Sequence, residues 1–106
     1  MENKCIKQIR RRIVKNFLDI IFLAELKKVQ PQSAYALMNL VHRKFGFLIS
    51  AGTVYALLYS MERKELVIGE RTENKRIYRL TQKGNETINI IGKAKEEFFQ
   101  YAKTVF

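Results

Sequence analysis

Residues 50–63 read SAGTVYALLYSMER, from Ser50 to Arg63. Apolar side chains recur in this segment at helical spacing, at Val54, Leu57, Leu58 and Met61. This pattern predicts an amphipathic helix, and the Ser50 hydroxyl is placed to cap its N-terminus. The opposite face is small, hydroxylated or cationic, with Ala51, Gly52, Thr53, Tyr55, Ala56, Tyr59, Ser60 and Arg63. Small residues allow close approach to a nucleic-acid groove, and Thr, Tyr and Arg side chains contact phosphates or base edges. The two tyrosines fit a half-buried position equally well.

A second amphipathic helix is predicted just before this one. Pro31 separates it from the preceding segment, and Ser33 or Gln32 lies near its start. Its apolar stripe consists of Ala34, Leu37, Met38, Val41 and Phe45. Gly46 supplies a stop, and residues 47–49 form a link too short for a helix. Two helices joined in this way predict a helix-turn-helix unit, with residues 50–63 as its second, recognition helix.

Two strand-like segments follow, residues 66–72 and 75–80, on either side of Glu73 and Asn74. Their β-branched and aromatic residues around a polar turn predict a hairpin, which forms a wing beside the recognition helix. The cationic side chains of this wing are Arg71, Lys75, Arg76 and Arg79. We expect them to contact phosphates or to enter the minor groove. Charges on a β-edge also deter aggregation, so part of this charge is expected without any nucleic acid.

An N-terminal amphipathic helix is predicted from apolar residues spaced three or four apart, at Ile6, Ile9, Ile13, Phe17, Ile20 and Ala24. Its first half carries Lys4, Lys7, Arg10, Arg11, Arg12 and Lys15. These cations fit a phosphate-binding face and fit a solvated face as well, and the sequence leaves both interpretations open.

A final helix is predicted from Thr81 onward. Its apolar residues keep the rhythm of a helix-helix seam, at Ile91, Ala94, Phe98, Tyr101 and Val105. Phe99 and Phe106 add apolar surface that so small a core cannot easily cover. We therefore expect this helix, helped by the N-terminal helix, to form the interface of a homodimer.

The chain has 106 residues, with 20 Lys and Arg against 10 Asp and Glu, and a formal net charge of +10 at pH 7. This length fits one domain, and this charge favours an anionic partner, nucleic acid before a membrane surface. Cys5 and His42 are single residues of their type, so no disulfide and no metal site is expected. No nucleophile-base pair or glycine-rich phosphate loop stands out, so neither an enzyme nor a cofactor is expected. The sequence carries no signal peptide or membrane-spanning pattern, and we expect a cytoplasmic protein.

Over residues 17–84 the sequence resembles the winged-helix transcriptional regulators of the PadR-like family. The family's first helix is similar to residues 17–26, and its second helix is echoed by Ala34-Tyr35 and Phe45-Gly46. Its Ser-Pro-Gly-Thr-Leu-Tyr-Pro segment resembles residues 50–56, although Ala51 and Ala56 replace the two prolines. Its closing Tyr-Arg-Leu-Thr, with a glycine three residues on, stands at residues 78–84. Ser33-Ala34 replaces the family's usual His-Gly.

The resemblance implies a homodimer that binds double-stranded operator DNA through the recognition helix and the wing. We predict a mainly α winged helix-turn-helix fold, with residues 1–80 as the DNA-binding domain and residues 81–106 as the dimerisation helix. The predicted function is a sequence-specific transcriptional regulator, a repressor acting on an inverted repeat. The expected DNA-binding residues are Ser50, Gly52, Thr53, Tyr55, Tyr59, Ser60, Arg63, Arg71, Lys75, Arg76 and Arg79. A DNA-organising protein without sequence preference and a protein-interaction module remain as alternatives, and no residue pattern names a small-molecule effector.

Overall fold

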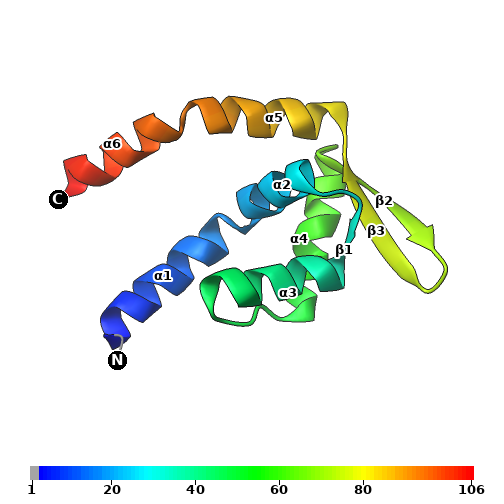
Figure 1. Ribbon diagram of the computed structural model, residues 1–106, viewed down its shortest axis with the longest axis horizontal. Coiled ribbons are helices and arrows are strands. Elements are labelled where there is room, and N and C mark those ends of the chain that lie inside the picture. The colour runs from blue at the N-terminus through cyan, green and yellow to red at the C-terminus, as the bar shows by residue number, and fades with distance from the viewer. Residues whose placement is uncertain (1–2) are drawn as a thin grey trace.

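The computed structural model describes residues 3–106, and Figure 1 shows their arrangement. In chain order the elements are α1 (Lys4–Asn16), α2 (Leu18–Lys28), β1 (Gln32–Ser33), α3 (Ala34–Phe45), α4 (Ala51–Arg63), β2 (Val67–Thr72), β3 (Lys75–Leu80), α5 (Gln82–Lys93) and α6 (Lys95–Val105). The predicted fold class, a mainly helical winged helix-turn-helix, is confirmed.

The helix-turn-helix pair α3 and α4 has the boundaries that its local sequence dictates. The Ser33 hydroxyl accepts a hydrogen bond from the Ala36 amide at the start of α3. Gly46 ends that helix with a φ of 79°, a left-handed conformation that costs glycine little. The inward face of α4 is buried as predicted, because Val54, Leu58 and Met61 are at most 1% exposed. These side chains pack with those of α2 and α3 in one core.

The wing is a β-hairpin of β2 and β3 with a two-residue turn. It belongs to a three-stranded antiparallel sheet of order β1-β3-β2. Its register pairs Thr72 with Lys75, and Glu73 in the turn has a φ of 51°. The edge strand β1 pairs Ser33 with Ile77 and was not predicted. Two residues are too few to show the alternation that identifies a strand in a sequence. This third strand ties the start of α3 to the wing.

The expectation of one continuous helix over residues 6–24 is wrong, because the chain bends at Phe17. Phe17 has φ −105° and ψ 17°, although its amide still donates to the Ile13 carbonyl. Asn16 is a poor helix former, and the two halves have different neighbours. Five residues of α2 are buried, whereas Val14 alone is buried in α1. The bend lets α2 follow the core while α1 extends beyond it (Figure 1).

The C-terminal helix is also divided, at Ala94, where one helix was predicted. Ala94 has φ −95° and ψ 4°, and its amide donates to the Ile91 carbonyl, three residues back. This tighter turn follows Gly92, whose missing side chain weakens a helix. Helix α5 contributes the buried Ile88 to the core, whereas α6 has no buried residue.

An ion pair at the core boundary joins α2 to α3. The Glu25 carboxylate is almost buried, and its Oε1 lies 2.6 Å from Lys44 Nζ and 3.5 Å from Lys28 Nζ. The hydrogen bond to Glu25 raises the pKa of Lys44. Along residues 3–106, no helix is both long and apolar enough to cross a membrane.

Candidate nucleic-acid interface

Helix α4 presents its small and hydroxylated face to solvent. Tyr55 and Tyr59 are 52% and 64% exposed, so the half-buried alternative is wrong for both side chains. Thr53, Ala56 and Arg63 are exposed beside them, and Ser60 is half-buried. The Arg63 guanidinium lies 5.8 Å from the Tyr59 ring centroid. This face is therefore free of core packing along the length of the helix.

The N-terminus of α4 is fixed by its cap. Ser50 Oγ accepts from the Thr53 amide at 3.2 Å and donates to Thr53 Oγ1 at 2.9 Å. The Ser50 hydroxyl is thus already used within the helix, and it orients the Thr53 hydroxyl. A Cβ added at Gly52 would meet no atom of the described chain within 4 Å. The packing of the fold therefore does not require a glycine at this position.

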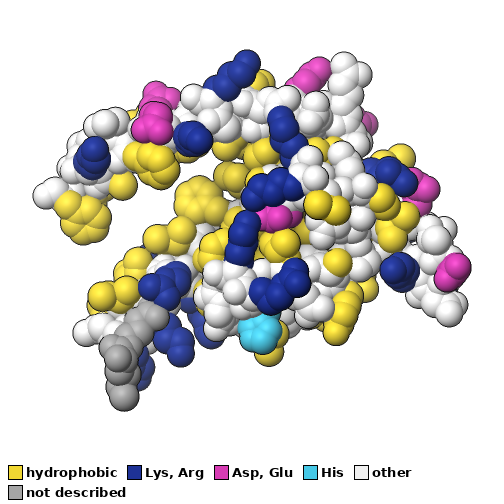
Figure 2. Space-filling view, viewed as in Figure 1, with side chains coloured by type: hydrophobic (Ala, Val, Ile, Leu, Met, Phe, Trp, Pro, Cys, Tyr) yellow, Lys and Arg dark blue, Asp and Glu magenta, His cyan; other side chains and the backbone are white. Residues whose placement is uncertain are grey.

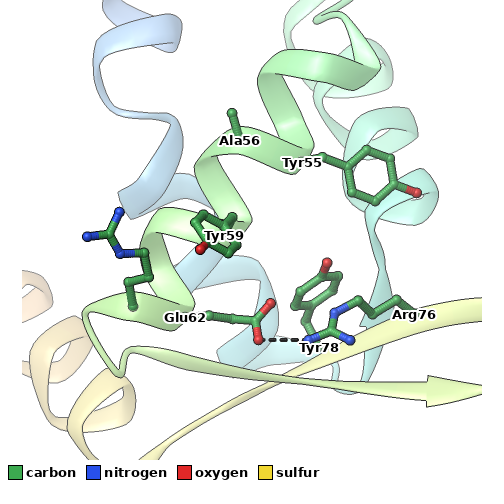
Figure 3. Close-up of a pocket in the computed structure, with 7 residues that line it drawn as sticks. Tyr55, Ala56, Tyr59, Glu62, Arg76 and Tyr78 are labelled. Carbon is green, nitrogen blue, oxygen red and sulfur yellow. Dashed lines mark hydrogen bonds and ion pairs between the residues drawn. The ribbon is translucent and has the colours of Figure 1, made fainter.

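The C-terminal half of α4 meets strand β3 in a shallow pocket, shown in Figure 3. Tyr55, Tyr59 and Glu62 line it from the helix, and Arg76 and Tyr78 line it from the strand. Arg76 Nη2 lies 2.9 Å from Glu62 Oε2, and the carboxylate raises the pKa of Arg76. The pocket joins the exposed helix face to the wing through one charge pair.

Gly69 and Tyr78 of the hairpin lie beside the Arg76 guanidinium that pairs with Glu62. A Cβ at Gly69 would lie 2.6 to 2.9 Å from the Arg76 guanidinium, so only glycine lets Arg76 cross the sheet in this way. The guanidinium also lies 5.9 Å from the ring centroid of Tyr78. Tyr78 is 2% exposed, and burial raises the pKa of its hydroxyl.

The four predicted wing cations fall into two classes. Arg76 pairs with Glu62, and Arg79 Nε lies 3.2 Å from Glu70 Oε1. Arg71 and Lys75 are exposed near the hairpin turn, and neither forms an ion pair within residues 3–106. The tip of the wing therefore carries two cations without an ion-pair partner in the described chain, together with the Glu73 carboxylate of the turn.

A sequence profile described as the transcriptional regulator PadR-like family matches residues 22–90. The chain belongs to this family. Among solved structures, a transcriptional regulator from Thermoplasma acidophilum has a TM-score of 0.75 at 23% identity, over 89% of this chain and 92% of that one. A PadR-like transcription factor from Bacteroides fragilis has a TM-score of 0.74 at 19% identity, over 93% and 99%. A PadR family regulator from Eggerthella lenta has a TM-score of 0.73 at 21% identity, over 95% and 88%. These similarities show the shared fold. The comparison with curated protein sequences gave no significant match.

Family membership makes this protein a transcriptional regulator that acts on DNA, and not an enzyme, as the sequence predicted. Within residues 3–106, no group of three or more His, Cys, Asp or Glu side chains is placed to hold a metal ion.

The predicted dimer residues of this PadR-like regulator lie along one side of α5 and α6. Ile91, Phe98 and Tyr101 line an apolar pocket together with Phe17 and Ile20 from the N-terminal helices. Ala94 is half-buried at the bend, and Val105 is 77% exposed. Figure 1 shows α1 and α6 extending from the body on the same side.

Glu62, Gly69 and Tyr78 were not among the predicted site residues of the PadR-like regulator. Tyr59 lies four residues after Tyr55, and Glu62 lies three residues after Tyr59. Helical periodicity therefore places Glu62 on the same face as the two tyrosines. No comparable signal marks Gly69, because its role depends on where the Arg76 side chain crosses the sheet.

Proposed function

We propose that this PadR-like regulator is a homodimeric repressor that binds double-stranded operator DNA in a sequence-specific manner. The observation that carries the proposal is the exposed face of α4, which consists of small, hydroxylated and aromatic side chains and adjoins a cationic wing. A solvated helix gains nothing from exposing Tyr55 and Tyr59, whereas a helix in the major groove uses such groups at base edges.

In the proposed complex, α4 enters the major groove and the wing lies over the flanking backbone. Thr53, Tyr55, Tyr59 and Ser60 contact base edges, and Gly52 allows the helix to approach closely. Arg71 and Lys75 bind phosphates directly, because neither forms an ion pair with a carboxylate of residues 3–106. Arg63, Arg76 and Arg79 lie nearby with aromatic or acidic partners, so their contribution depends on those partners.

The proposed dimer uses residues 81–106 with support from the N-terminal helices. Phe98 and Tyr101 are 45% and 61% exposed, and Phe17 beside them is 51% exposed. Apolar side chains gathered in one pocket are a typical interface of a two-fold dimer. Such a dimer presents two copies of α4 to one face of the duplex, with half-sites about 34 to 36 Å apart in an inverted repeat.

The test is fluorescence anisotropy with two duplexes of equal length. One is a sequence enriched from a random pool by the wild-type protein, and the other is a shuffled version. Preference for the enriched duplex by roughly a thousandfold or more, kept at physiological salt, supports the proposal. Equal binding that disappears with salt would indicate a DNA-organising protein instead. No binding to either duplex would indicate a protein-interaction module.

A further inference from the structure

Helix α1 is strongly divided into a cationic and an apolar face. Its sequence contains six Lys and Arg residues and no carboxylate. Lys4, Lys7 and Arg11 follow one another at spacings of three and four and line a shallow depression. Ile6, Ile9 and Ile13 occupy the opposite face. Figure 2 shows cationic side chains on the side of α1 toward α3, and hydrophobic ones on the side toward α6.

The cationic face is attached beside the start of the recognition helix. The Arg11 guanidinium carbon lies 5.1 Å from the centroid of the Phe47 ring. Phe47 is 6% exposed and belongs to the core, and it precedes the α4 cap Ser50 by three residues. The ring therefore holds Arg11 against the link that leads into α4. The wing contacts α4 near its other end, through Glu62.

Within residues 3–106, the segments that lead from α1 across α3 to α4 offer no carboxylate to a bound ligand. Helix α3, the link at residues 46–50 and residues 51–61 of α4 contain no Asp or Glu. His42, Arg43 and Lys44 close α3 with further basic side chains, of which Lys44 is paired with Glu25 of α2. An anionic polymer bound to α4 meets only neutral or cationic groups as it passes from the helix N-terminus to α1.

We propose that the cationic face of α1 binds the sugar-phosphate backbone beside the major groove that α4 enters. This inference rests on the proposed function, and it gives α1 the position opposite the wing. The backbones of the two strands border the major groove, so cations on both sides of α4 contact both of them. Each phosphate neutralised releases counterions and raises the salt dependence of binding.

An anionic membrane surface is the competing partner for a basic amphipathic helix. Membrane binding requires the apolar face of α1 to point out of the molecule. Ile6, Ile9 and Ile13 are 45 to 57% exposed in the single chain. The hydrophobic side chains of α1 lie on the side toward α6 (Figure 2), where the proposed dimer interface would cover them. Val14 is buried in the core, and with Phe45 it lines a pocket beside Ile9 and Ile13. With its apolar face turned toward the proposed dimer interface, α1 offers its cationic face to DNA rather than its apolar face to lipid.

The experiment compares two variants that each remove three positive charges. One carries Lys4→Gln, Lys7→Gln and Arg11→Gln on α1. The control carries Lys27→Gln, Lys93→Gln and Lys103→Gln, which are exposed on α2, α5 and α6. Affinity for a random 40-base-pair duplex and for the enriched duplex is measured against salt concentration. Circular dichroism and sedimentation verify that both variants keep the fold and the association state of the wild type.

We expect the α1 variant to lower the slope of log K against log salt on both duplexes. The decrease should be about 0.9 for each phosphate that the variant no longer neutralises, up to roughly 2.7 for each protomer and roughly 5.4 for a bound homodimer. The ratio of the two affinities should stay unchanged, because phosphate contacts carry no sequence information. The control variant should change the slope by less than half as much. A single Arg11→Lys substitution should keep most of the wild-type slope.

Equal slopes for the α1 variant, the control and the wild type would overturn the inference and leave the proposed function intact. A wild-type protein without preference for the enriched duplex would refute sequence-specific regulation, and the slope on the random duplex would still decide the role of α1. Unchanged DNA binding together with abolished binding to phosphatidylserine vesicles would assign α1 to a membrane.

Discussion

Arg76 crosses the sheet over Gly69 and ends 2.9 Å from the Glu62 carboxylate at the edge of the exposed α4 face. The positive charge of Arg76 is therefore compensated within the protein. In the proposed complex, Glu62 sets a negative charge where phosphates would approach. Substituting Glu62→Gln should free Arg76 for the backbone. We expect tighter binding to all duplexes and a salt slope that is steeper by about 0.9 for each protomer, or about 1.8 for the proposed homodimer, measured by anisotropy.

Two further variants sharpen this test of the Glu62–Arg76 pair. Gly69→Ala displaces the guanidinium without changing any charge, and it should shift binding in the same direction by a smaller amount. Glu86→Gln on α5 removes the same charge outside the pocket between α4 and β3, and it should leave the slope unchanged. Weaker binding by Glu62→Gln would show instead that the ion pair holds the wing in its binding position.

A glycine at position 52 lowers helix stability without a packing reason. Gly52→Ala should raise the free energy of unfolding by up to about 1 kcal/mol, because alanine is the better helix former and the added methyl meets open space. The same methyl should weaken DNA binding by blocking close approach. Urea unfolding and anisotropy measure the two effects.

Gly92→Ala is the matched control for Gly52→Ala, since Gly92 also lies within a helix with open space around its Cα. It should give a similar gain in stability with unchanged DNA affinity. If Gly52→Ala binds DNA as tightly as the wild type, the N-terminal turn of α4 does not approach the groove closely.

Gly84 lies where the start of α5 crosses the chain that leads into the wing. A Cβ at this position would overlap the carbonyl oxygen of Leu66, which also accepts a hydrogen bond from the Thr81 amide. Backbone atoms cannot move aside as a flexible side chain does. We expect Gly84→Ala to lower the free energy of unfolding by about 1 to 3 kcal/mol in urea titrations. A decrease below about 0.5 kcal/mol, typical of an ordinary surface substitution, would contradict this packing.

The helix-turn-helix was predictable because its boundaries depend on residues close in sequence. Ser33, Gly46 and Ser50 each act within one helical turn, through a side-chain cap or a left-handed backbone. The bends at Phe17 and Ala94 were not predictable from the apolar spacing. The three- and four-residue rhythm runs unchanged through both positions, and it is the same for a straight helix and a bent one.

In the candidate site, too, one part was predictable from the sequence and another part was not. The exposed face of α4 follows from helical periodicity, which orients Thr53, Tyr55 and Tyr59 away from the core. The pairing of Glu62 with Arg76 joins residues 14 positions apart in two elements. It depends on the strand register and on the empty space at Gly69, so it required the tertiary structure. Sequence reasoning therefore treated four wing cations as equivalent, although two of them are paired.

Stability should fall in alkaline solution because two groups that ordinarily titrate near pH 10, Tyr78 and Lys44, have raised pKa values in the folded state. Burial raises the pKa of Tyr78 above its ordinary 10.0, and the bond to Glu25 raises the pKa of Lys44 above 10.5. A raised folded pKa means that the folded state favours the protonated group. The stabilisation is complete below the unfolded pKa and is lost as pH rises through the folded value.

The urea midpoint should therefore decline above about pH 10, measured as a function of pH. Tyr78→Phe removes the phenol and should make this decline shallower. Tyr35→Phe is the control, because Tyr35 is 69% exposed and should leave the profile unchanged. Lys44 is about half exposed, so we expect Tyr78 to dominate the difference. Identical profiles for both variants would exclude Tyr78 as the cause.

The apolar pocket between the N-terminal and C-terminal helices predicts which substitution separates the proposed dimer. Phe98→Glu places a carboxylate among Phe17, Ile20 and Tyr101, where a second chain would have to desolvate it. We expect the dimer dissociation constant from sedimentation equilibrium to rise by about a hundredfold, which corresponds to about 2.7 kcal/mol. Ile90→Glu is the matched control, because Ile90 is 68% exposed on α5 and lies outside this pocket. If both variants stay dimeric, the interface lies elsewhere on the molecule, and a monomeric wild type at micromolar concentration would remove the dimer itself.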